Sequence, residues 1–399
     1  MSFVDFSAAG GSHAAHDAGI GDAGAANARA WSDPAAWNGR VPAPDDDVVV
    51  GPGRTIVVDG DVCVRSITVF GTLLFAPRDL TLRTRWILVD GGTLRAGSAE
   101  SPHEARLTIG LAGSASDRDV RGLGTKFLAA VRGGTIGLHG RLCRSWVPLG
   151  APTAAGCNAI RVAQPVDWVP GAAIAIASGG TELPLVEERR VEAVGRDRLT
   201  LMLDRPLQHR HAGVESPLRA PASTLGKVAL LDRSIVVAGD DASAERGFGA
   251  HCLIGSRLPD AGDDGARASI GRFRGVEFRR VGQFNRRDRF PLHWCDNGDS
   301  TASCVIDCVI RESFQRGVVI TGSPHVRIAG NVVYKSFGHA YVIEEAADAA
   351  QITGSNLAVR PRVVRFADPG LRSLHEHHPR AFWFGPQRAP APPTVRRAR

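Results

Sequence analysis

The chain has 399 residues, 43% hydrophobic and 22% charged, and its 46 glycines and 24 prolines favour many short strands and turns over long helices. The formal net charge is +7, but residues 380–399 hold five arginines and no acid, so the rest carries only about +2. The positive charge therefore lies in the tail and does not form the basic stripe that a nucleic-acid-binding protein carries on its folded body. Because the chain has no stretch of about 18 apolar residues, we expect no membrane-spanning helix.

The first residues, 1–30, are rich in alanine and glycine and lack the basic start and apolar run of a secretory signal, so we expect a flexible arm. Ordered structure is expected to begin near Trp31. From Asp45 to Leu111, short apolar runs such as Asp47–Val50 and Thr55–Val58 alternate with glycine-containing turns. Their spacing of roughly 8–12 residues is typical of an all-β sandwich, barrel or solenoid.

The middle of the chain, from Lys126 to about Leu207, continues this pattern without a convincing amphipathic helix. In the last third, Val305–Ile310 matches Ile328–Val333 at an offset of 23 residues, and Gly317–Ile320 matches His339–Ile343 at an offset of 22. A helix-free unit that repeats at this length predicts a β-solenoid, in which stacking buries the apolar face that a single coil leaves open.

Asparagine recurs at one turn of these units, as Asn331 and Asn356, where side-chain amides can form a ladder along the stack. The seven cysteines include no CxxC pair, so we do not expect a zinc site. Cys304 and Cys308 could lie close together in one coil, and we expect them to be buried free thiols. After Phe384 the sequence is rich in proline and arginine, and we expect a disordered tail over residues 386–399.

Two groups of motifs resemble known families. The opening resembles the G-eight (G8) domain, named for its eight glycines, in Trp31-Ser-Asp-Pro-Ala-Ala-Trp37, Gly39-Arg-Val-Pro42 and Val64–Gly71. Further on, Arg289-Phe-Pro-Leu-His-Trp-Cys295 with Gly298-Asp299 resembles the R-Y-P-x-H-x-H and Gly-Asp segment of the cell-migration-inducing hyaluronidase family and its bacterial relatives. The resemblance covers about Trp31 to Trp383.

The resemblance implies an all-β fold: a β-rich G8 module over residues 31–150 leading into a right-handed parallel β-helix over residues 151–385. It also implies an extracellular or cell-surface location and a polysaccharide partner, because animal members of the family are associated with hyaluronan depolymerisation or binding. We expect a monomer, and we leave open whether a divalent metal ion is a cofactor.

The chain departs from the family's pattern at three positions that matter for chemistry. The second histidine of the H-x-H pair is Cys295, the histidine of a later T-x-H-G segment is Thr321, and the Glu-Asp-Gly motif is Glu344-Glu345-Ala346. If the family's site needs those imidazoles as ligands or proton carriers, this protein is weakened or inactive.

Cleavage of a polysaccharide needs either two carboxyl groups that flank the bond or a base beside a uronate, with polar side chains that converge on one groove. Residues at equal positions of neighbouring coils converge in this way. The expected catalytic residues are His293, Asp299, His339 and Glu345. The expected substrate-binding residues are Arg289 as a carboxylate clamp, Trp294 and Tyr341 as stacking platforms, and Glu344.

Structural roles for the same residues remain open. His293 could be hydrogen-bonded at a coil corner, Arg289 could pair with Glu277, and Asp299 is a natural turn residue. Core packing is the alternative for both aromatic residues. Elsewhere, the adjacent pair Glu187-Glu188 is expected to form a solvated strand edge.

Two functional hypotheses follow. The first is a depolymerase, either a hydrolase or a lyase, that acts on an acidic glycan such as hyaluronan. The alternative is a non-catalytic glycan-binding or structural surface module whose site is degenerate or truncated. The sequence leaves open whether the protein is an enzyme.

Overall fold

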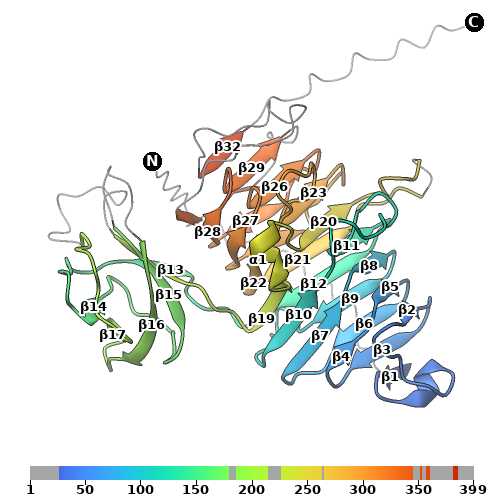
Figure 1. Ribbon diagram of the computed structural model, residues 1–399, viewed down its shortest axis with the longest axis horizontal. Coiled ribbons are helices and arrows are strands. Elements are labelled where there is room, and N and C mark those ends of the chain that lie inside the picture. Colours follow the sequence, from blue (N-terminus) through green and yellow to red (C-terminus); the bar gives the residue numbers. More distant parts are fainter. Residues whose placement is uncertain are drawn as a thin grey trace, which may run out of the picture.

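The computed structural model describes residues 27–178, 186–213, 226–262, 265–344, 351–352, 356–359 and 381–384. In these residues the strands form three long parallel sheets and one antiparallel sheet. The chain visits the three parallel sheets in turn and pairs with its own previous coil on each return (Figure 1). The predicted parallel β-helix is therefore confirmed.

The three parallel sheets are named A, B and C. In stacking order, the described part of sheet A contains β1 (Ala28–Ala30), β3 (Thr55–Val58), β6 (Thr72–Phe75), β9 (Thr93–Ala96), β12 (Thr135–His139), β21 (Ile270–Arg274), β24 (Cys304–Ile306), β27 (Arg327–Ala329) and β30 (Gln351–Ile352). Sheet B contains β2 (Asp47–Val50), β5 (Ser66–Val69), β8 (Ile87–Asp90), β11 (Phe127–Val131), β20 (His251–Gly255), β23 (Leu292–Cys295), β26 (Val318–Thr321), β29 (Tyr341–Glu344) and β32 (Phe382–Phe384). Sheet C contains β4 (Val62–Cys63), β7 (Leu80–Thr84), β10 (Leu107–Leu111), β19 (Ile235–Gly239), β22 (Val276–Arg279), β25 (Val309–Ser313), β28 (Val332–Ser336) and β31 (Leu357–Val359).

The core fills the space between the three sheets because every second side chain of a strand points inward. Ile56, Leu73, Leu94 and Ile136 follow one another in register along sheet A, and all four are buried in the same cluster. Burial of each such side chain contributes about 1.5–3 kcal/mol, so the stack is held together by repetition of the same contact.

The repeat seen in the sequence is the coil itself. Val305 pairs with Ile328, which is the predicted offset of 23 residues. Val318 pairs with Tyr341, also at 23, so the expected offset of 22 for that strand is wrong by one residue. The asparagine ladder is confirmed: the Nδ2 of Asn331 donates to the Oδ1 of Asn356 at 3.0 Å.

The G8 segment forms the first coils of the same β-helix, and glycines allow these coils to approach closely. Gly71, Gly92 and Gly134 each precede a strand of sheet A. A Cβ at these positions would lie 2.2–2.5 Å from a carbonyl oxygen of the preceding coil, closer than any side chain tolerates. Glycine at this corner is therefore required by packing.

The middle of the chain differs from the expectation. Residues 151–385 were expected to form a parallel β-helix, but an antiparallel sheet, here called the insert, interrupts the stack between β12 and β19. Its order is β13 (Trp146–Pro148), β18 (Lys227–Leu230), β15 (Ala173–Ala177), β16 (Val186–Val194), β17 (Thr200–Leu203) and β14 (Ala159–Arg161). The stack resumes without a gap, since β12 pairs with β21.

The insert packs against the outer face of sheet C. Ala175 and Ala229 of the insert share one buried cluster with Val309, Val332 and Tyr334 of the β-helix. The Oε1 of Glu188 accepts a hydrogen bond from the hydroxyl of Tyr334 at 2.8 Å. One outer face of the β-helix is thus covered by protein in this region.

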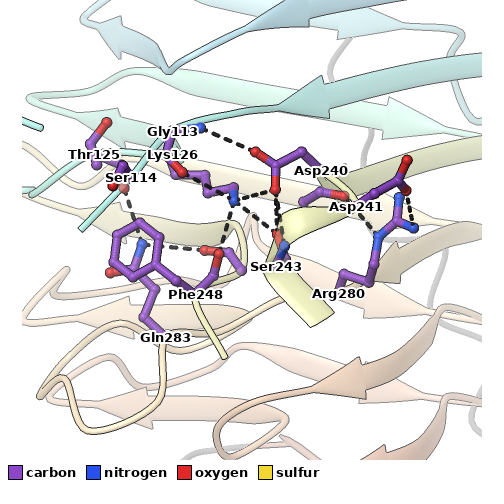
Figure 2. Close-up of polar contacts among 12 residues, drawn as sticks. Gly113, Ser114, Thr125, Lys126, Asp240, Asp241, Ser243, Phe248, Arg280 and Gln283 are labelled. Atoms are coloured by element: carbon purple, nitrogen blue, oxygen red, sulfur yellow. Dashed lines mark hydrogen bonds and ion pairs between the residues drawn. The ribbon is translucent and has the colours of Figure 1, made fainter. Parts of the chain in front are cut away.

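A buried lysine joins the coil before the insert to the coil after it (Figure 2). The Nζ of Lys126 donates to the Oδ1 of Asp240 at 2.7 Å, to the Oγ of Ser243 at 2.8 Å and to the carbonyl oxygen of Phe248 at 2.9 Å. Ser243 lies in the short helix α1 (Ala242–Arg246). Burial lowers the pKa of Lys126, and Asp240 opposes that shift. Because all three ammonium protons are used, we interpret this cluster as a structural link.

The sequence predicts a flexible arm over residues 1–30 and a disordered tail over residues 386–399. Ala28–Ala30, expected in the flexible arm, instead forms β1 and pairs with β3. The rest of the arm up to residue 26 and the tail over residues 386–399 lie outside the described residues. Within the described part, no helix is long and apolar enough to cross a membrane. All seven cysteines are described as free thiols. Cys308 is buried as expected, whereas Cys304 is only half-buried and Cys63 and Cys157 are exposed.

Candidate functional site

The region of the resemblance centres on the outer face of sheet B at β23, β26 and β29. Two rows of side chains face outward there, one residue on either side of the buried Trp294. His293 pairs with Val319, which pairs with Val342. We call this outer surface the B-face.

His293 is at the centre of the B-face but is only 2% exposed. Its ring lies edge-on to Phe290, with ring centroids 5.0 Å apart. Burial lowers the pKa of His293 to about 3, and contact with the backbone of Asp288 only partly opposes the shift. Its Nδ1 has no hydrogen-bond partner. The imidazole is therefore neutral near pH 7 and cannot reach a ligand without movement of its neighbours.

The second outward row contains the positions at which the chain departs from the family's pattern. Cys295 pairs with Thr321, and Thr321 pairs with Glu344. Positions 293, 295 and 321 therefore lie on one face within two adjacent coils, although they are distant in sequence. In this chain only one of the three is an imidazole.

An ion pair crosses the B-face above a small apolar floor. The Nη1 of Arg316 lies 3.0 Å from the Oε1 of Glu344, and the two side chains are 12% and 27% exposed. The guanidinium also lies 5.8 Å from the ring centre of Phe290. Phe290, Val319 and Val342 form the floor. A charged pair above apolar carbon is an arrangement that can hold a sugar ring.

A second carboxyl group borders the B-face. Asp288 is exposed in the loop between β22 and β23 and has a left-handed backbone, with φ of 60°. Partial desolvation raises its pKa, the charge of Glu344 adds to this rise, and neighbouring arginines including Arg316 oppose it. Sequence reasoning missed Asp288 and Arg316. The 23-residue repeat could have found Arg316, because it occupies the position of His339 one coil earlier.

Arg289 does not act as an exposed clamp. Its Nη2 donates to the carbonyl oxygen of Gly122 at 2.7 Å, which ties the loop before β11 to the loop before β23. The alternative pairing with Glu277 is also wrong, because the Oε1 of Glu277 lies 2.8 Å from Arg311. The role of Arg289 that the structure supports is loop positioning.

The other expected catalytic residues are dispersed. Asp299 is exposed in the turn after β23, where its carboxylate accepts from Thr301 at 2.7 Å and lies 2.8 Å from the Nδ1 of His325. His339 is 7% exposed and precedes β29. Glu345 lies outside the described residues. The structure thus places His293 and Glu344 in the two outward rows of the B-face, two coils apart, whereas Asp299 lies in the turn after β23.

The prediction that Trp294 and Tyr341 stack on sugar rings is wrong. Trp294 is fully buried and Tyr341 is 1% exposed, and both belong to the core between the sheets. Trp294 lies edge-on to Phe273 at 6.0 Å, and Tyr341 stacks on Phe382 at 4.8 Å. Both point inward because they alternate with the outward row of their strands.

A buried ionic cluster in the insert was also unexpected. Glu187 was expected at a solvated edge, but it is 4% exposed and its Oε1 lies 2.9 Å from the Nε2 of His211. Although burial opposes ionisation, hydrogen bonds from the backbone of Gln208 and from His211 contribute to lowering the pKa of Glu187 to about 2. Arg189 completes the cluster, so its charges are compensated within the insert.

The structure also bears on the possible metal cofactor. Among the residues that the structure describes, no group of three or more His, Cys, Asp and Glu side chains is arranged to hold a metal ion.

Comparison with known proteins places the same regions in two families. A G8 domain model matches residues 36–150, and a CEMIP beta-helix model matches residues 247–378. Fibrocystin-L of Homo sapiens is 30% identical over 394 residues, which is 89% of this chain and 9% of fibrocystin-L. Communication mutant protein F of Dictyostelium discoideum is 24% identical over 362 residues, which is 87% of this chain and 31% of that protein.

Among solved structures, the tailspike gp61 of Pseudomonas phage phi297 is similar at a TM-score of 0.22 with 11% identity, over 74% of this chain and 40% of the tailspike. That score is too low to carry an argument about function. The chain spans less than a third of each curated relative described above. The two family matches confirm the resemblance that the motifs indicated.

Proposed function

Because this chain is a G8-domain protein related to the CEMIP β-helix proteins, we propose that it binds an acidic polysaccharide on the B-face. The observation that carries the proposal is the Arg316–Glu344 pair above the floor of Phe290, Val319 and Val342. A guanidinium can hold a sugar carboxylate through two parallel hydrogen bonds, a carboxylate accepts from sugar hydroxyls, and the floor can cover the apolar face of a ring.

Binding without cleavage is favoured by the state of the imidazole. A general base must reach the proton that it removes and must titrate near the working pH. His293 is buried, and its pKa is lowered to about 3. The two outward positions beside it are Cys295 and Thr321, which supply no imidazole.

The proposal extends to the location and state of the protein. We place it outside the cell or on its surface, where acidic polysaccharides occur, and we expect it to act there as a monomer. The relation to the G8 and CEMIP β-helix families supports the proposed location.

Titration calorimetry with hyaluronan oligosaccharides of defined length tests the proposal. Arg316→Gln removes the guanidinium and should weaken binding about tenfold, since it breaks a charge-assisted contact. Arg83→Gln is the matched control, because Arg83 is an exposed strand arginine on sheet C. Equal affinity of Arg316→Gln and Arg83→Gln would remove the B-face from the binding site.

A second candidate, hydrolysis, is favoured by the pair of carboxyl groups at the B-face. The pKa of Asp288 is raised, while Glu344 contacts Arg316. A glycosidase uses two carboxyl groups that flank the scissile bond, and the one that acts as the acid has a raised pKa. Incubation of hyaluronan with the protein, followed by sizing of the polymer, distinguishes the two. Shortening that disappears in both Asp288→Asn and Glu344→Gln would support hydrolysis.

A further inference from the structure

We propose that the outer face of sheet A is a second binding surface for a linear acidic polysaccharide, on which Arg95, Arg272 and Arg327 contact successive acidic sugars. We call this surface the A-face. The choice of ligand rests on the proposed function, but the residues are separate from those of the B-face. The two surfaces can therefore succeed or fail independently.

The three arginines point away from the core. Along β9, Leu94 and Ala96 are buried in the core while Arg95 between them is half-buried. Along β21, Phe273 is buried and Arg272 is half-buried. Arg327 is exposed beside the buried Ile328. Strand alternation thus puts all three guanidinium groups on the same outer side.

Strand register puts the arginines in one column at regular intervals. Arg95 pairs with Gly137, and Gly137 pairs with Arg272. Arg272 pairs with Cys304, and Cys304 pairs with Arg327. Each interval is two coils, about 9.6 Å at the usual spacing of paired strands. That interval is close to the length of one disaccharide in an extended chain, in which an acidic sugar alternates with a neutral one.

The strands of the A-face carry cations and no acid. The described strands of sheet A contain five arginines and one histidine and neither Asp nor Glu. Carboxylates stand in the turns beside these strands. They include Asp59 after β3, Asp307 after β24, Glu100, which lies near the charges of His139 and Arg274, and Asp299, which contacts His325. A polyanion that lies along the strands' outer side would therefore meet positive charge in each second coil.

The arginines are available for a ligand to different degrees. Arg95 and Arg327 form no ion pair with any residue that the structure describes. The Nε of Arg272 donates to the carbonyl oxygen of Ala302 at 3.0 Å, which holds that side chain in place. Two residues before Arg95 and Gly137 in their strands lie the half-buried Thr93 and Thr135, whose hydroxyls suit sugar hydroxyls. The same column continues beyond Arg95 to Thr72 and Thr55.

A polysaccharide fits the A-face better than a nucleic acid. Single-stranded nucleic acid binds on aromatic side chains that stack with its bases. The aromatic residues of these strands, Phe75 and Phe273, point into the core. Phosphates also follow one another more closely than every second coil.

The test measures binding of hyaluronan oligosaccharides by fluorescence anisotropy at low and high salt. The double variant Arg95→Gln/Arg327→Gln should raise Kd about tenfold at low salt, with a smaller change at high salt. Arg83→Gln should leave Kd unchanged. Affinity should increase with oligosaccharide length until the chain reaches from Arg95 to Arg327, four coils or about 19 Å.

The outcomes separate the two surfaces. Unchanged affinity of the double variant, with loss of affinity in Arg316→Gln, would overturn the A-face and leave the proposed function intact. Tighter binding of a single-stranded oligonucleotide than of hyaluronan, lost in the same double variant, would also overturn it. Absence of hyaluronan binding by the wild-type protein would contradict the proposed function itself and the A-face with it.

Discussion

Sheets A and B belong to one β-helix and share one core, yet their outer faces differ in charge and in how far other parts of the chain bury them. The described strands of sheet B contain Asp47, Asp90 and Glu344 and no lysine or arginine. Those of sheet A contain five arginines and no acid. On sheet B, Arg289 ties a loop over the outer face, and the outward row is largely buried. On sheet A, Arg327 is exposed.

This difference separates two ways in which a solenoid can acquire a binding surface. Inward positions must be apolar for the coils to stack, so they can carry little specificity. Outward positions are free to vary, and register brings equal positions of neighbouring coils together. The B-face concentrates different groups in two coils, whereas the A-face repeats one group along the stack.

The largest expected effect on stability tests whether Trp294 belongs to the core between the sheets. Trp294→Ala should lower the free energy of unfolding by about 3–5 kcal/mol, because it empties a large core site. Arg327→Gln should change it by less than about 0.5 kcal/mol. Chemical denaturation measures both. If Trp294→Ala kept its stability and lost glycan binding, Trp294 would be a ligand platform after all.

The next effect is the response of the B-face to acid. Folding holds the pKa of His293 at about 3, below the ordinary value of 6.5, so the unfolded chain binds protons first as pH falls. The contribution of His293 to stability should thus be complete above about pH 6.5 and should decline below it, by at most about 1.4 kcal/mol per pH unit. His251, also buried with a lowered pKa, adds to the decline.

Thermal unfolding at a series of pH values measures this slope. His293→Gln removes one titrating group and should flatten the curve. The same slope in His293→Gln and in the wild-type protein would show that His293 is protonated without cost, which contradicts its burial.

The repeating coils of the β-helix could be predicted from the sequence, but the antiparallel insert, which depends on how strands pair in space, could not. The contact between Val305 and Ile328 could be predicted from the sequence, because stacked coils repeat apolar residues at an interval of one coil. The insert was missed because strands such as Ala173–Ala177 and Thr200–Leu203 show the same short apolar pattern whether their partners are parallel or antiparallel. Local pattern does not encode the direction of the partner.

The candidate site was recovered in part for the same reason. His293 and Glu344 were found through motifs, and register brings their rows together. Trp294 was misassigned because a motif does not say which side of the strand faces the core. Arg316 and the A-face arginines belong to no motif, and only the register reveals their neighbours.

The last pair of variants tests whether positions 293, 295 and 321 of the B-face lie close enough to bind one ligand together. Cys295→His/Thr321→His places two imidazoles in register beside His293 and should change the free energy of unfolding by less than about 1 kcal/mol. It should also bind zinc more tightly than the wild-type protein, since side chains two apart on a strand share one face. Cys304→His/Arg327→His is the matched control, with the same register on sheet A. Equal zinc affinity in the two variants would contradict the comparison.

The most direct test of the central claim is one titration of the wild-type protein with a long hyaluronan oligosaccharide, after which the oligosaccharide is sized. Glycan binding without catalysis predicts a saturable isotherm, a weaker one for Arg316→Gln, and an oligosaccharide of unchanged length. Absence of binding by the wild-type protein, or a shortened oligosaccharide, would contradict the account.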